Sequence, residues 1–252
     1  MSDPGTNAPA QAHGVDHVRW HEPPQDARSA FARGLAHDLR APLRSIDGFS
    51  SLLEAQAGDV LPPAARDHLQ RIRAAAARMG RLVDGLHLHA QAQDAPLRHA
   101  PVDISLLAEW AGAELQDAEQ GRAARIAVSP GLAVDGDEYW LKAALKAVLQ
   151  NAWTFSAPRE RIDIEVHGEA SGEALRLRIR DGGIGFDPAH GDRLFLPFQR
   201  LHTPEEGAGA GLGLATAWCV VRRHGGRMRM QGAPQAGCVV EIELPLRARD
   251  GG

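Results

Sequence analysis

Hydrophobic positions recur every three or four residues along two long stretches in the N-terminal third of the chain. The first stretch predicts a helix that begins near Asp26, and the second predicts another that ends near residue 94. Between them, Gly58-Asp59 and Pro62-Pro63 form a turn cluster, and a proline pair also suits the start of a helix. Two long helices joined by a short turn predict an antiparallel hairpin. The two apolar seams are Phe31, Leu35, Leu39, Pro42, Ile46, Phe49 and Leu53, then Leu69, Ile72, Ala76, Met79, Val83, Leu86 and Ala90.

A hairpin with one apolar seam on each helix cannot bury both seams by itself. A second copy would cover them by completing a four-helix bundle, so the pattern favours a homodimer through the hairpin. The alternative is that the seams pack against the rest of the same chain.

The spacing of the hydrophobic positions changes after a linker at about residues 94–101. Short alternating stretches now mix with helical ones, which predicts a single sheet covered by helices on one face, an α/β sandwich. The predicted helices cover 103–120, 137–155 and 214–223, and the predicted strands cover 126–128, 162–166, 175–179, 228–230 and 239–244.

The fold class is therefore α+β, with three parts. Residues 1–25 lack any periodicity and are rich in Pro, Gly, Ala, Gln and His, so we expect a disordered arm. Residues 26–94 form the hairpin, and residues 101–248 form the sandwich domain.

Composition excludes several classes of protein. The formal net charge of −4 gives no basic face for nucleic acid. No run approaches the ~20 apolar residues of a membrane span, and the N-terminus lacks the pattern of a signal peptide, so we expect a cytoplasmic protein. The two cysteines, Cys219 and Cys238, are too few for a disulfide framework or a Cys-rich zinc site.

One candidate nucleophile stands on the first helix, in the run His37-Asp38-Leu39-Arg40-Ala41-Pro42. If Leu35 and Leu39 belong to the seam, His37 faces away from the core, where a large reactant can approach its ring. A neutral imidazole is a nucleophile near pH 7, and Asp38 can orient the ring proton so that the other nitrogen is free. The alternative is an ordinary surface histidine.

Two glycine-rich stretches suggest a nucleotide pocket. Residues 181–186, Asp-Gly-Gly-Ile-Gly-Phe, follow a predicted strand, and the Asp181 carboxylate can accept a hydrogen bond from an exocyclic amine such as that of adenine. Residues 207–215 open the predicted helix at 214–223, and free amides at a helix N-terminus can bind phosphates. Asn151, on the helix over 137–155, offers an amide oxygen suited to Mg²⁺.

Taken in order, these motifs resemble those of the histidine kinase family. The resemblance spans about residues 27–247 and includes the run 194–202, Leu-Phe-Leu-Pro-Phe-Gln-Arg-Leu-His, which looks like the lid segment of phytochrome-type and other soluble sensor kinases. It implies a dimerisation and histidine-phosphotransfer hairpin followed by an ATP-binding domain of the kind shared with gyrase.

The resemblance also implies roles for individual residues. His37 would accept the phosphoryl group, with Asp38 as its acid/base neighbour and Arg200 reaching the terminal phosphate. Asn151 would coordinate Mg²⁺, and Asp181 would bind the adenine of ATP. The remaining ATP-binding positions implied by the family are Gly183, Gly185, Gly209, Gly211, Gly213 and Leu214.

Three positions depart from the family pattern. Many members carry a second asparagine where this chain has Ala147, and a lysine or arginine where it has Thr154. Both changes remove groups near the phosphates, so we expect weaker ATP binding or turnover. Ala41 lacks the polar group that many dual-function members use for phosphatase activity, so we do not expect the chain to dephosphorylate its partner.

Two functions of different classes follow. The first is a sensor histidine kinase of a two-component system, which phosphorylates His37 from ATP and passes the phosphoryl group to a response-regulator receiver domain. The second is a catalytically weak phosphotransfer or docking scaffold that binds such a receiver. No sensor domain is recognisable, so the stimulus reaches the chain from a separate sensor protein, through residues 1–25, or through a longer protein of which this is a fragment.

Overall fold

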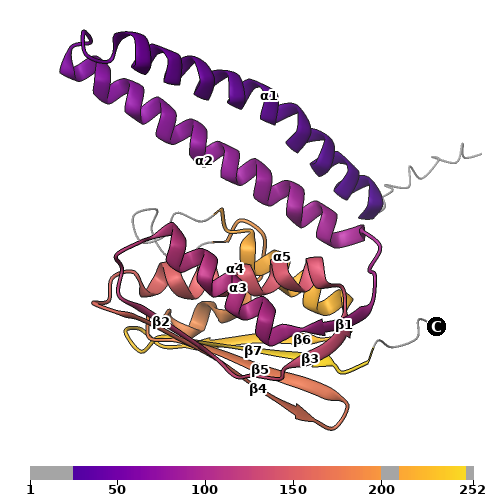
Figure 1. Ribbon diagram of the computed structural model, residues 1–252. Coiled ribbons are helices and arrows are strands. Elements are labelled where there is room, and N and C mark those ends of the chain that lie inside the picture. The colour runs from indigo at the N-terminus through magenta and orange to yellow at the C-terminus, as the bar shows by residue number, and fades with distance from the viewer. Residues whose placement is uncertain (1–24, 200–209, 248–252) are drawn as a thin grey trace, which may run out of the picture.

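The computed structural model describes residues 25–199 and 210–247, so the predicted arm at residues 1–25 lies almost wholly outside the described part. A long helical hairpin stands beside a sandwich in which helices cover one face of a sheet (Figure 1). The predicted α+β class, with a hairpin followed by an α/β sandwich, is confirmed. The helices are α1 (Gln25–Ala57), α2 (Pro63–Asp94), α3 (Ile104–Ala118), α4 (Glu138–Ser156) and α5 (Gly213–Arg223), with a 3-10 helix, η1 (Pro188–Arg193).

The strands form two sheets. The larger sheet has the order β2-β4-β5-β7-β6, with β2 parallel to β4 and every other neighbouring pair antiparallel. A small antiparallel pair, β1 with β3, lies in the segment expected to be linker and in the segment before α4, and the sequence did not predict it. The strands are β1 (Ala100–Asp103), β2 (Ala124–Val128), β3 (Ala133–Gly136), β4 (Ile162–Ser171), β5 (Ala174–Asp181), β6 (Arg227–Gly232) and β7 (Cys238–Pro245).

The main core lies between the large sheet and helices α3, α4 and α5, which all lie on one of its faces (Figure 1). The sheet can contribute to this core on one face because side chains alternate along its strands. Every second residue of β5 and β7 is buried, while the residues between them face solvent. The solvent face of these strands carries paired charges, such as Arg178 with Glu241. The largest fully buried side chains include Trp153, Ile164 and Leu177.

Aspartate side chains cap the N-termini of two of these helices. Asp103 accepts a hydrogen bond from the amide of Leu106 at the start of α3, and Asp137 accepts one from the amide of Trp140 at the start of α4. Asp137 also accepts from the amide of Arg98, so the same carboxylate ties the segment after α2 to the sandwich.

The contact between α1 and α2 corrects the expected seam of the first helix. The residues of α1 that are buried in the hairpin include Ala36, Leu43 and Ser50, which recur every seven residues but do not belong to the predicted seam. Ala36 is small and Ser50 is polar, so this stripe is weakly hydrophobic and the larger apolar residues beside it dominated the pattern. On α2, Leu69, Ala76, Val83 and Ala90 are buried as predicted.

Most of the first predicted seam is instead exposed in the single chain. It forms an apolar surface on the outside of the hairpin, which is what an unpartnered half of a bundle presents. The dimer itself stays a prediction. The large exposed apolar residues on the two helices themselves are Phe31, Leu35, Ile46, Phe49, Leu52, Leu53, Ile72 and Met79.

Within residues 25–199 and 210–247, none of the helices combines the length and the hydrophobicity needed to cross a membrane.

Candidate functional site

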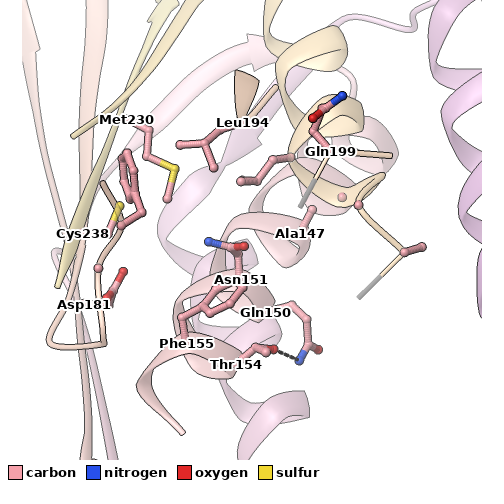
Figure 2. A pocket seen from close by; sticks show the side chains of 16 residues that line it. Ala147, Gln150, Asn151, Thr154, Phe155, Asp181, Leu194, Gln199, Met230 and Cys238 are labelled. Atoms are coloured by element: carbon pink, nitrogen blue, oxygen red, sulfur yellow. Dashed lines mark hydrogen bonds between the residues drawn. The ribbon is translucent and has the colours of Figure 1, made fainter. Parts of the chain in front are cut away.

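A pocket of about 240 Å³ lies between α4, the end of β5 and the start of α5 (Figure 2). It brings together three motifs that are far apart in the sequence. Its described lining residues are Ala147, Gln150, Asn151, Thr154, Phe155, Asp181, Gly185, Phe186, Leu194, Gln199, Ala210, Gly211, Gly213, Leu214, Met230 and Cys238.

Asp181 ends β5 and places a buried carboxylate in this pocket, with only 5% of the residue exposed. The amide of Gly183 donates to its Oδ1 at 2.9 Å, and the amide of Cys238 also stabilises it. Burial nevertheless raises the pKa of Asp181 to about 6, because desolvation of the charged form outweighs the two amide hydrogen bonds. The carboxylate is therefore ionised at neutral pH and has an unused accepting capacity that faces the pocket.

The loop after Asp181 holds its shape through close backbone contacts. A methyl group on Gly183 would lie 2.5 Å from the carbonyl oxygen of Phe155, and one on Gly185 would lie 1.9 Å from that of Ala233. Gly185 also has a φ of +63°, which other residues rarely adopt. Gly185 lines the pocket, whereas Gly183 shapes it from behind through its hydrogen bond to Asp181.

Across the pocket, α4 presents one face of its C-terminal half. Asn151 lies nearest the centre, and Ala147 and Thr154 lie one turn before and after it (Figure 2). Gln150 donates to the hydroxyl of Thr154 at 3.4 Å. Two of the three departures from the family pattern, Ala147 and Thr154, thus line the pocket, and no described lining residue carries a positive charge.

The third wall is the segment that leads into α5. Gly211, Gly213 and Leu214 line the pocket at the N-terminal end of this helix, where amides lack partners within the helix and the dipole is positive. Two of the predicted site residues, Gly209 and Arg200, lie outside the described residues.

His37 lies elsewhere, on the exposed surface of α1. Its side chain is 84% exposed, and its Nδ1 lies 3.3 Å from Oδ1 of Asp38. When Nδ1 carries the proton and donates it to Asp38, Nε2 keeps its lone pair and points away from this contact. His37 and Asp38 are not among the lining residues, so the structure does not bring the histidine and the pocket together.

The helix α2 nevertheless contacts the segment that borders the pocket. A methyl group on Gly85 would lie 3.2 Å from the Leu212 side chain, and His89 Nδ1 lies 3.2 Å from the hydroxyl of Thr216 on α5. Arg223, also on α5, donates to the carbonyl oxygens of Ala92 and Ala95 at the end of α2. The hairpin and the pocket domain are thus joined along α5.

Sequence reasoning missed several residues of the pocket. Met230 and Cys238 line it from the sheet, and Phe186 and Leu194 come from the segment after β5. Cys238 is buried, and its position opposite Asp181 follows from the register of β7 on β5. No signal in the sequence could reveal this pairing, because the register between strands that are not consecutive in the sequence depends on the folded sheet.

The pocket residues fit a nucleotide with a metal ion, judged by their chemistry. A pocket of this size is below the ~300–1,000 Å³ of sites that enclose drug-sized ligands, so it suits a base, with phosphates at its mouth. No group of three or more His, Cys, Asp or Glu side chains suited to a metal occurs in the described residues. A metal would therefore need phosphate oxygens in addition to the amide oxygen of Asn151, as Mg²⁺ commonly does.

Comparison with known families matches both parts of the chain. Residues 27–94 match the His Kinase A (phospho-acceptor) domain, and residues 136–248 match the family described as histidine kinase-, DNA gyrase B-, and HSP90-like ATPase.

Individual proteins agree with these matches. Over 216 residues the chain is 27% identical to the phytochrome-like protein Cph1 of Synechocystis sp., covering 86% of this chain and 29% of that protein. It is 32% identical to the phosphate regulon sensor protein PhoR of Pseudomonas aeruginosa, covering 88% of this chain and 51% of that protein. The chain thus spans about a third to a half of the length of these curated relatives.

A solved structure also resembles the whole arrangement. The crystal structure of full-length ShkA in complex with AMPPNP aligns with a TM-score of 0.67 at 27% identity, covering 88% of this chain and 47% of that one. The mycobacterial sensor histidine kinase MprB aligns with a TM-score of 0.51 at 29% identity, covering 60% of this chain and all of that one.

The loop geometry predicts opposite outcomes for two glycine substitutions. We expect Gly185→Ala to lower the free energy of unfolding by roughly 2–4 kcal/mol, because the methyl group meets a backbone carbonyl and φ is positive. Gly182→Ala, in the same loop, meets nothing within 4 Å and should stay within about 0.5 kcal/mol of wild type. Urea denaturation of the two variants measures the difference, and equal stabilities would contradict this account of the loop.

Proposed function

Because the chain carries the catalytic core of a sensor histidine kinase, we propose that it uses ATP to phosphorylate His37 and then passes the phosphoryl group to a receiver-domain aspartate. The observation that carries the proposal is the exposed imidazole of His37 beside Asp38, on a hairpin attached to a pocket with a buried carboxylate. If His37 were an ordinary surface histidine, neither the neighbouring carboxylate nor the attached pocket would be required.

Asp181 would recognise the base of ATP. Its ionised carboxylate accepts a hydrogen bond from the exocyclic amine of adenine, while Met230, Phe186 and Leu194 supply apolar surface for the ring. Gly211 and Gly213 let the backbone approach the phosphates closely, and the free amides at the start of α5 donate to them. A bound Mg²⁺ would neutralise phosphate charge, with Asn151 as its protein ligand.

His37 and Asp38 would carry the transfer. Asp38 accepts a hydrogen bond from the Nδ1–H of the ring, which leaves the lone pair of Nε2 free to attack the γ-phosphorus of ATP, and Asp38 takes the Nδ1 proton as the ring gains positive charge. The Nε2–P bond forms while the bond from the γ-phosphorus to the bridging oxygen breaks, and ADP leaves. Positioning and charge neutralisation supply most of the catalysis in such a step, and by family resemblance Arg200 would stabilise the terminal phosphate.

Transfer requires a rearrangement of the two parts of the molecule. In the structure α5 is joined to α2 by the His89–Thr216 contact and by Arg223, and His37 lies outside the pocket. Either the pocket domain moves along the hairpin, or the pocket serves the histidine of a second subunit. Breaking a few hydrogen bonds on a partly exposed joint costs little compared with unfolding either part.

The proposal extends to the partners of the chain. The exposed apolar face of α1 would bind the same face of a second copy, so that two hairpins form a four-helix bundle with His37 on its outside. A receiver domain would then reach His37 from solvent, in the cytoplasm, where ATP is available. A separate sensor protein or a longer chain would supply the stimulus.

A docking scaffold with little catalysis is the second candidate. The observation that favours it is the absence of positive charge among the described lining residues, since Ala147 and Thr154 replace groups that would contact phosphates. Such a protein would bind nucleotide and receiver but transfer phosphoryl groups slowly.

Labelling separates the two candidates. Protein incubated with γ-labelled ATP and Mg²⁺ should acquire a label that is lost in acid and kept in base, as expected for a phosphorus–nitrogen bond. His37→Gln should abolish this label because it removes the nucleophile. His68→Gln, at another exposed histidine of the hairpin, should keep it.

Two results would count against the kinase. Nucleotide binding without any label would favour the scaffold, and label that persists in His37→Gln would place the acceptor elsewhere.

Asp181 should make ATP binding depend on pH. Its pKa in the folded protein is raised from 3.8 to about 6, so the carboxylate is ionised above that pH and protonated below it. ATP affinity should therefore be full near pH 7.5 and fall as pH drops through 6, by roughly tenfold per unit well below the pKa. Calorimetric titrations between pH 5 and pH 8 measure this dependence.

Asp181→Asn is the control, because the phosphates of ATP titrate equally with both proteins. The variant should bind ATP more weakly at pH 7.5 and should lack the additional loss near pH 6. An unchanged ATP affinity in this variant would mean that adenine binds elsewhere.

The dimer can be tested on the exposed face of α1. Wild-type protein should have twice the 27.0 kDa chain mass by light scattering, and Phe49→Asp should shift the mass toward one chain by placing a charge in the apolar bundle. Phe49 is 73% exposed in the single chain, and Val60, at the hairpin turn, is 82% exposed. Val60→Asp should therefore leave the mass unchanged, whereas a monomeric wild-type protein would refute the bundle.

A further inference from the structure

Arg159, in the connection between α4 and β4, contacts the back of the loop that follows Asp181. Its Nε donates to the carbonyl oxygen of Gly182 at 3.0 Å, and its Nη2 donates to that of Gly183 at 3.0 Å. The same Nη2 donates to the carbonyl oxygen of Gln235 at 2.9 Å, in the turn between β6 and β7. A single guanidinium thus joins two backbone segments that together form one end of the pocket.

This contact is not an ordinary surface ion pair. In the part of the chain that the structure describes, no carboxylate lies within ion-pair distance of Arg159, and its side-chain donors go to backbone carbonyls. Its neighbour Arg161 behaves differently, since it pairs with Asp163 and its side chain is 61% exposed. A planar guanidinium with several fixed donors suits three converging carbonyls better than an ammonium does.

The peptide group between Gly182 and Gly183 links Arg159 to Asp181. The carbonyl of this peptide accepts from Arg159, and its N–H donates to Oδ1 of Asp181 at 2.9 Å. Both hydrogen bonds depend on one orientation of one peptide plane. Two glycines flank that plane and restrict it little, so a side chain that holds its carbonyl also holds its N–H.

We propose that Arg159 is a positioning residue for nucleotide binding, which holds the Gly182–Gly183 peptide so that the Asp181 carboxylate faces the base. It acts through the backbone, because Arg159 is not among the described residues that line the pocket. The hydrogen bond also polarises the peptide, which strengthens the N–H donor to the carboxylate. This inference rests on the proposed ATP pocket.

The test compares variants of Arg159 with a matched variant of its neighbour. Arg159→Gln should lower ATP affinity at pH 7.5 on the order of 10-fold, because the carboxylate loses its support. The KM for ATP in autophosphorylation should rise by a similar factor with little change in kcat. Arg159→Lys should recover part of the affinity, since one ammonium can reach some of the three carbonyls. Arg161→Gln removes the same charge two residues away and should bind ATP like wild type.

A pH profile distinguishes positioning from simple loosening of the fold. Asp181 and Cys238 are the titratable groups among the described lining residues, and the Gly183 amide helps to keep the pKa of Asp181 from rising further. In Arg159→Gln that support weakens, so the pH at which ATP affinity falls should move upward. Arg161→Gln should leave this midpoint in place.

The outcomes are separable. If wild-type protein does not bind ATP, the proposed function is refuted, and so is this inference. If wild type binds ATP but Arg159→Gln binds equally well, only the role of Arg159 is refuted. A weaker Arg159→Gln with an unmoved pH midpoint and a lowered thermal midpoint would also refute it, as loss of fold alone. If Arg159→Gln does not fold, the same affinity and pH measurements on Arg159→Lys decide the question.

Discussion

The burial of one carboxylate constrains most of the pocket domain. Asp181 ends a central strand and is removed from water, which is costly for a charge unless hydrogen-bond donors replace its solvent. The donors are backbone amides, from Gly183 in the next loop and from Cys238 on β7. They can lie close enough because the loop carries glycines. The remaining accepting capacity of the carboxylate faces the pocket, where under the proposed function it would accept a hydrogen bond from the base of ATP.

The hairpin is governed by a different constraint, which is that α1 is apolar on two faces but packs against α2 on one of them. Ala36, Leu43 and Ser50 are buried on the face of α1 that meets α2, and most of the larger apolar residues of α1 are left on the outside. A helix that is apolar on two faces is suited to a bundle of four helices rather than two. Its remaining polar surface carries His37, so burial of the apolar face in a dimer would leave the imidazole open to its reactants.

The joint between the two parts gives the molecule a way to couple them. Thr216 donates to the carbonyl oxygen of Leu212, next to the pocket, and its hydroxyl oxygen lies 3.2 Å from Nδ1 of His89 on α2. Gln93 approaches the other ring nitrogen of His89 at 3.1 Å. A chain of polar contacts thus runs from the glycine segment at the pocket into the hairpin. A movement of α2 relative to α5 would therefore alter contacts that border the pocket.

The sequence alone determined most of the elements and the chemistry that they carry, although it did not predict the β1–β3 pair. The long helices, the alternating strands and the glycine stretches are local patterns, because hydrophobic period and backbone freedom act over a few residues. Asn151, Asp181, Gly211 and Gly213 could therefore be chosen as neighbours through a family resemblance. Only the tertiary structure decided which face of α1 meets α2, that Cys238 lies opposite Asp181, and that Arg159 supports the loop behind it. Those facts depend on register and on contacts between distant segments, which no local pattern encodes.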